Sequence, residues 1–121
     1  MPSYYTPSYQ KLSKHPRKFL ALTGYTIEEF RALLPHFQTQ FEHYVATKTL
    51  KGKLRIQRSY VDYANSPLPS IEDKLLFILI YLKQRLTQEA IATMFGLHQP
   101  DANRWIHLLR PLLNQALYEI H

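Results

Sequence analysis

The chain contains no cysteine and only three glycines in 121 residues. The missing cysteines exclude disulfide bonds and thiolate metal ligands, and they fit a reducing compartment. With so few glycines, no segment resembles a glycine-rich loop that cradles phosphates. The longest uninterrupted apolar run, residues 75–82, is much too short to span a bilayer. The first ten residues also lack the apolar core of a signal peptide, so we expect a cytoplasmic protein without a membrane partner.

Catalytic and metal-binding constellations are also missing. His36 and His43 are seven residues apart, but no third ligand accompanies them, so we interpret them as surface histidines. Four acids follow expected helix starts, where capping and the helix dipole explain them: Glu28, Glu29, Glu72 and Asp73. We therefore expect no catalytic residue, no metal and no cofactor in this chain.

Length and patterning predict one all-α domain with a hydrophobic content of 45%. Residues 15–22 are expected to form a short helix that ends at Gly24. Thr26, with Glu29 three residues later, predicts a capping box and a longer helix that Pro35 should kink or split. The chain is expected to divide into a flexible arm (1–10), N-terminal helices (12–48), an irregular basic linker (49–69) and a helix-turn-helix subdomain (70–121).

Within this last part, Ser70 is expected to cap a strongly apolar helix, and Pro111 is expected to begin a separate last helix. The linker contains LRIQRSYVDY, whose weak alternation leaves a strand or a hairpin open.

Residues 87–110 read TQEAIATMFGLHQPDANRWIHLLR, which predicts two helices around a tight turn. Thr87 is a good N-cap for the first helix. Gly96 stands where a left-handed residue ends that helix, and Leu97 can fold back over the turn. Pro100 suits the beginning of the second helix, because its missing N–H would be unpaired there. This arrangement is typical of a helix-turn-helix that reads DNA.

The second of these helices is expected to have two faces. Ala102, Trp105, Ile106 and Leu109 fall on the apolar side at about 100° per residue. The opposite side carries residue types suited to base edges, since arginine pairs with guanine and asparagine with adenine. The expected base contacts are Gln99, Asn103, Arg104 and His107.

Positive charge is concentrated in the first half of the chain. Residues 1–60 hold ten Lys/Arg and three Asp/Glu, about +7, whereas residues 61–121 hold five and six, about −1. The helix-turn-helix half is therefore nearly neutral, and much of any attraction to phosphates must come from the first half. The expected phosphate contacts are Thr87, Gln88, Arg110, Lys48, Lys51, Lys53, Arg55 and Arg58.

Two other interpretations of these features stay open. Amphipathic helix pairs joined by a glycine turn are common in all-α proteins, and a polar face is usually a solvated face. The chain could then be a protein-interaction domain that does not bind DNA. Alternatively, the same motif could serve a stand-alone transcriptional regulator.

The segments LTGYTIEEFRALLPHF and PSIEDKLLFILIYLKQRLTQEAIATMFGLHQPDANRWIHLLRPLL resemble the N-terminal region of bacterial insertion-sequence transposases of the DDE type (the insertion sequence five family). The resemblance covers about residues 20–117. It implies a helix-turn-helix domain that binds double-stranded DNA, at the element's terminal inverted repeats, in the bacterial nucleoid. It also implies a separate or downstream catalytic domain, RNase-H-like, whose three acids hold two divalent metals.

The chain departs from this family in two respects. YVDYANSPLPS stands where the family often carries a glycine- and arginine-rich stretch, which puts basic contacts there in doubt. The chain also ends at His121, before any catalytic domain, so a first reading frame, a remnant and a fragment remain alternatives. Pairing of two copies stays open, although no heptad pattern supports it.

Overall fold

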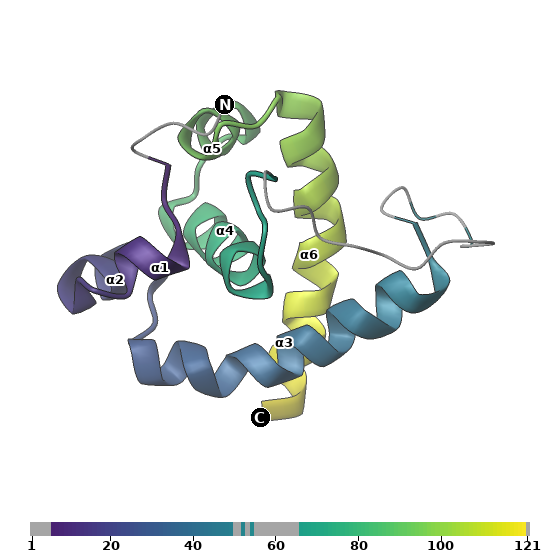
Figure 1. The fold of residues 1–121 in the computed structure, drawn as a ribbon, viewed down its shortest axis with the longest axis horizontal. Coiled ribbons are helices and arrows are strands. Elements are labelled where there is room, and N and C mark those ends of the chain that lie inside the picture. Colours follow the sequence, from purple (N-terminus) through teal and green to yellow (C-terminus); the bar gives the residue numbers. More distant parts are fainter. Residues whose placement is uncertain (1–5, 50–51, 53, 55–65, 121) are drawn as a thin grey trace.

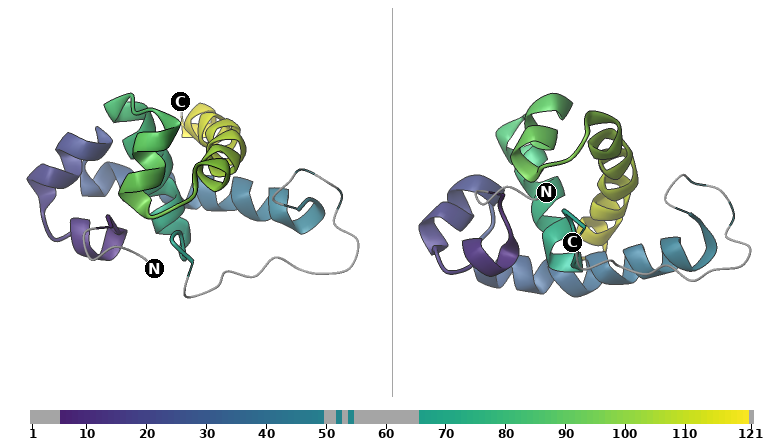
Figure 2. Two further views of the ribbon diagram at one scale, coloured as in Figure 1. Left: turned by 90° about the horizontal axis from the view of Figure 1, so that it is seen from above. Right: turned by 45° about the horizontal axis from the view of Figure 1, so that its top comes forward.

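The computed structural model describes residues 6–49, 52, 54 and 66–120. These residues form an all-α fold, as the sequence predicted. Figure 1 shows its helices arranged around α4, with α1 and α2 on one side and α6 on the other. Figure 2 shows the same order from two further directions. The helices are α1 (Tyr9–Leu12), α2 (Pro16–Thr23), α3 (Ile27–Thr47), α4 (Ile71–Gln84), α5 (Gln88–Phe95) and α6 (Gln99–Ile120).

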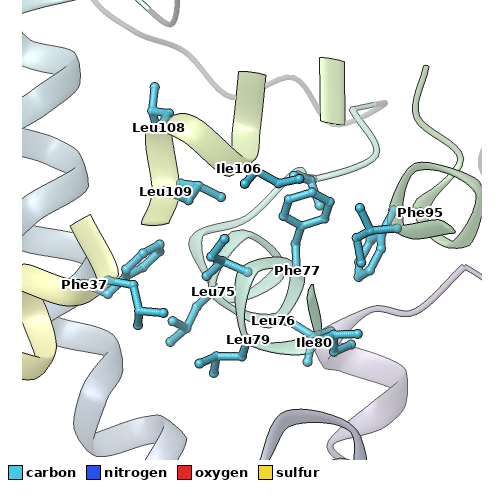
Figure 3. Packing of buried hydrophobic residues seen from close by; sticks show 14 of the residues in the cluster. Phe37, Leu75, Leu76, Phe77, Leu79, Ile80, Phe95, Ile106, Leu108 and Leu109 are labelled. Atoms are coloured by element: carbon cyan, nitrogen blue, oxygen red, sulfur yellow. The ribbon is translucent and has the colours of Figure 1, made fainter. Parts of the chain in front are cut away.

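Helix α4 is buried on all sides. Every residue from 73 to 80 is buried, because α2, α3, α5 and α6 all contact this helix. Figure 3 shows its side chains pointing in different directions, with Leu75 toward Phe37 and Phe77 toward Phe95. A helix that is apolar all round needs such a surrounding to be stable. None of the helices in the described part of the chain is long and apolar enough to cross a membrane.

The start of α4 also holds the N-terminal segment. Ser70 caps α4 by accepting a hydrogen bond from the Asp73 amide. The Tyr9 amide donates to Asp73 Oδ1 at 2.8 Å, and the Tyr9 ring stacks on Phe30. The prediction of a flexible arm over residues 1–10 is therefore wrong for its second half, because Tyr9 packs on the core and begins α1. Residues 1–5 lie outside the described part.

The expected start of a separate helix at Pro111 is wrong, and Pro35 does not split its helix. The alternative of a kink at Pro35 stays a prediction. Helix α3 begins with the predicted capping box of Thr26 and Glu29, and it runs through Pro35. Helix α6 likewise runs through Pro111 instead of beginning anew there. Proline removes one backbone hydrogen bond. Leu109 and Leu113 are buried on both sides of Pro111, and this burial favours a continuous helix.

A fully buried lysine connects α4 to α3, α6 and the preceding segment. Lys74 has no exposed surface, and its ammonium donates to the Leu68 carbonyl at 2.9 Å. The same ammonium lies 5.4 Å from the Phe41 ring centroid and 5.6 Å from that of Trp105. These two rings are stacked on each other at 6.5 Å. The cation is therefore satisfied by a carbonyl and by two aromatic faces.

The end of α4 is held by the N-terminal helices. The Gln84 side-chain amide donates to the carbonyls of Ala21 and Leu22 at the end of α2. Arg85 then terminates α4 in the left-handed conformation, with φ of 53°. Residues that follow α4 therefore begin α5 from a position that α2 helps to set.

Little of the expected basic linker falls in the described residues. Lys48 ends α3 and forms an isolated antiparallel bridge with Leu54, around Gly52 at φ of 83°. Leu68 is buried at the other end of the linker. Most of LRIQRSYVDY lies outside the described part, so the choice between strand and hairpin stays a prediction.

Candidate nucleic-acid interface

The turn between α5 and α6 has the predicted geometry. The Thr87 hydroxyl accepts a hydrogen bond from the Ala90 amide at 3.0 Å and so caps α5. Gly96 ends α5 in the left-handed conformation, with φ of 67°. The Leu97 amide reaches back to the Ala92 carbonyl at 2.8 Å, which closes the helix end. Residues 87–98 therefore form the first helix and turn of a helix-turn-helix.

Helix α6 separates its faces as predicted. Ala102, Ile106 and Leu109 are buried in the core, and Trp105 packs against it. Among the polar positions, Asn103 is half-buried, whereas Arg104, His107 and Arg110 are exposed. The exposed side chains of this face are therefore available to a partner, whereas Asn103 is partly covered.

Three of the four expected base contacts line one hollow of about 420 Å³. Asn103, Arg104 and His107 form its α6 wall together with Pro100 and Leu108. The opposite wall comes from Tyr44 and Gly52, at the end of α3 and just beyond it. The fold thus places part of the first half of the chain beside the polar face of α6.

One basic residue of the first half lies close to this hollow. The Lys48 ammonium is 5.5 Å from the Tyr44 ring centroid, and Tyr44 lines the hollow. The other members of the expected basic stretch, Lys51, Lys53, Arg55 and Arg58, lie outside the described residues.

The polar side chains of α6 are engaged to different degrees. Arg104 pairs with Asp101, one turn earlier, at 3.1 Å, and both side chains are about 40% exposed. An exposed pair of this kind is worth about 0–1 kcal/mol, so it holds the guanidinium only weakly. Asn103 is held by a neighbour from the other helix, since Gln88 Nε2 donates to Asn103 Oδ1 at 2.9 Å.

The remaining predicted contacts are more scattered. Gln99 is exposed at the start of α6 but does not line the hollow, and Arg110 is exposed almost two turns beyond Arg104. The Thr87 hydroxyl already caps α5, although the residue itself is exposed. Gln88, expected to contact phosphate, has its amide committed to Asn103.

Sequence reasoning missed Tyr44 and Asp101 as members of this site. The helical spacing of Tyr44 matches that of Phe37 and Phe41, so the sequence pattern indicates only a position on the apolar face of α3. Its proximity to α6 is a tertiary contact between residues about 60 positions apart, which no local pattern reveals. Asp101, by contrast, precedes Arg104 by three residues, a spacing from which a pair could have been found.

More basic side chains lie on the opposite side of α4. Helices α1 and α2 and the turn between them carry Lys11, Lys14, Arg17 and Lys18, all exposed. Helix α2 contacts α4 on the side away from α6, as all views in Figures 1 and 2 show. The positive charge of the first half is therefore divided between two regions of the surface, which the sequence count alone did not indicate. Within the described ranges, no group of three His, Asp or Glu side chains is placed to hold a metal ion.

Comparison with known families gives one match, which covers α4, α5 and nearly all of α6. Residues 66–119 match the family model described as the helix-turn-helix of DDE superfamily endonucleases. Neither the curated proteins nor the solved structures contain a match to the chain. The matched segment thus supports a DNA-binding domain of the transposase type, and the fold places its helix-turn-helix at α5 and α6.

Proposed function

We propose that this chain is the DNA-binding part of a bacterial transposase and recognises the ends of its insertion element. The observation that carries the proposal is the exposed polar side of α6. This helix is the second helix of the motif, and it lies within the segment that matches the endonuclease family. In such motifs the second helix enters the major groove with its N-terminal residues against base edges. Assignment to the insertion sequence five family rests on the sequence resemblance.

In this proposal α6 supplies sequence discrimination. Gln99, Asn103, Arg104 and His107 contact base edges, and Arg104 leaves its weak pair with Asp101 to do so. Arg104→Ala should therefore lower discrimination between specific and random duplex by about 1–3 kcal/mol. Titrations of both duplexes measure this difference, and an unchanged sequence preference would refute the assignment.

The basic first half supplies affinity that does not depend on sequence. Lys48, Lys51 and Lys53, with Arg55 and Arg58, contact phosphates in addition to Thr87, Gln88 and Arg110. Replacing Lys51 and Lys53 together by alanine should weaken binding to every duplex and reduce the salt slope by about 2, since each phosphate contact contributes nearly one unit. An unaltered slope would remove these two lysines from the proposed interface.

The proposal assigns cleavage to another polypeptide segment. A DDE catalytic domain, separate or downstream, would cut the DNA that this chain holds, in the cytoplasm at the nucleoid. Pairing of two copies on two ends is compatible with this arrangement. The most direct test is the DNA beside the gene: a following reading frame for a DDE domain and flanking inverted repeats are expected. Their absence would favour a stand-alone regulator.

Binding itself is tested by gel shift of the full chain on short duplexes at several salt concentrations. We expect tighter binding to the element's terminal repeat than to a shuffled duplex of equal composition. Affinity for both should fall as salt rises. The absence of salt-dependent binding to any duplex would favour a protein-interaction domain instead.

A further inference from the structure

A hydrogen bond between Gln88 and Asn103 connects the two helices of the helix-turn-helix. Gln88 is the first residue of α5, and Asn103 lies in the second turn of α6. Their side chains meet at 2.9 Å, and both residues are half-buried. In the described part of the chain, this is the only hydrogen bond between side chains of α5 and α6. It therefore joins the first helix of the motif to a proposed base-reading side chain of the second.

In this structure the bond orients the Asn103 amide relative to α5. A side-chain amide has an acceptor oxygen at one end and a donor NH2 group at the other. Gln88 donates to the oxygen of Asn103, so that oxygen lies toward α5. The NH2 group of Asn103 is then the end that is presented elsewhere. Either end would serve equally well if Asn103 could turn freely.

The two ends of this amide suit different bases. Donor groups are complementary to the N7 and O6 acceptors of guanine, to N7 of adenine and to O4 of thymine. An outward oxygen would instead accept from the amino groups of cytosine or adenine. Gln88, which does not need to touch the base, can thus decide the preference that Asn103 expresses.

We propose that Gln88 is a positioning residue that sets the base preference of Asn103, so that the pair reads one base position as a unit. The proposal rests on the proposed DNA-binding function. In the wild-type chain the NH2 group of Asn103 meets the base, which favours acceptor-bearing edges and disfavours cytosine at that position.

Two substitutions of Gln88 separate positioning from simple contact. Gln88→Glu introduces an ionised carboxylate, which only accepts hydrogen bonds and can therefore bond only to the NH2 end of Asn103. The amide must turn, and its oxygen then faces the base. Gln88→Met keeps a side chain of similar length without a hydrogen bond, so both orientations of Asn103 become accessible. Thr93→Glu is the charge-matched control, because Thr93 is exposed on the same helix and its hydroxyl donates to the Glu89 carbonyl of that helix.

The experiment is selection of bound duplexes from a randomised library by the full chain and its variants, followed by sequencing. Gln88→Glu should change the selected base at one position toward cytosine or adenine, by roughly ten-fold in relative enrichment. Gln88→Met should flatten the preference at that same position and leave the others. Thr93→Glu should change no position, and circular dichroism should show the same helix content for all variants.

Several outcomes would overturn the proposal. If both Gln88 variants keep the wild-type motif while binding all duplexes more weakly, Gln88 is only a phosphate contact and the proposed DNA-binding function stands. If their selected motifs lose every position equally, the residue acts through general stability. If the wild-type chain binds no duplex or selects no motif, the proposed function fails first and this inference fails with it.

Discussion

Replacing Lys74 by alanine should be among the most destabilising single changes in this chain. Lys74 is fully buried, and its ammonium lies between a carbonyl of residue 68 and the rings of Phe41 and Trp105. Alanine removes four side-chain atoms beyond Cβ from the middle of the core and leaves the Leu68 carbonyl without this donor. Both losses fall on the junction of α3, α4 and α6.

The expected loss of stability is the balance of opposing contributions. Truncation of a long buried side chain to alanine costs about 2–5 kcal/mol, and a hydrogen bond from a charged group contributes about 1.5–3 kcal/mol. Removing a buried cation also relieves its desolvation penalty, which offsets part of that loss. We expect Lys74→Ala to lower the free energy of unfolding by about 3–5 kcal/mol. Lys74→Met retains most of the volume, so it should cost only about 1–2 kcal/mol.

Urea unfolding followed by tryptophan fluorescence measures these differences in the free energy of unfolding with a probe that lies beside Lys74. Trp105 is the only tryptophan of the chain, and its ring centroid is 5.6 Å from the Lys74 ammonium. Circular dichroism should give the same midpoint if unfolding is two-state. Lys18→Ala is the control, because Lys18 is exposed on α2 and its loss should change stability by less than about 0.5 kcal/mol. If the free energy of unfolding of Lys74→Ala stays within about 1 kcal/mol of the wild-type value, burial and the contacts of the Lys74 ammonium do not stabilise the fold as proposed.

Three further changes test the backbone features of the fold by thermal unfolding. Arg85→Gly should stabilise by about 0.5–1 kcal/mol, since glycine relieves the strain of the left-handed φ of 53°; a lower melting temperature would contradict this. Gly96→Ala should cost about 1–2 kcal/mol for the converse reason at φ of 67°, and an unchanged stability would argue against a strained turn. Pro111→Ala should stabilise by about 1–3 kcal/mol, because it restores an N–H inside α6; destabilisation would mean that the fixed φ of proline is favourable there.

Local signals predicted much of the fold correctly because capping chemistry acts over three or four residues. Thr26 with Glu29, Ser70 and Thr87 all cap the helices assigned to them, and Gly24 and Gly96 end theirs. Pro111 was interpreted wrongly for the opposite reason. Whether Pro111 breaks a helix depends on burial by distant residues, and that burial comes from tertiary packing.

The candidate site likewise has features that the sequence predicts and features that only the tertiary structure shows. The separation of faces on α6 follows from helical periodicity. The placement of Asn103, Arg104 and His107 on its polar face could therefore be predicted from the sequence. Tyr44 and the Gln88–Asn103 bond could not, since each depends on how two helices are placed in space. The roles of Lys51 and Lys53 stay predictions, because they lie outside the described residues.

The all-round burial of α4 also limits where this protein can be divided. The family match begins at residue 66, yet α4 packs against α2 and α3, which precede it. A fragment starting at residue 66 would present buried side chains such as Leu76 and Ile80 to water. The segment that matches the family model is therefore shorter than the segment that packs around α4. Fusion proteins or binding assays built on this helix-turn-helix should carry the N-terminal helices with it.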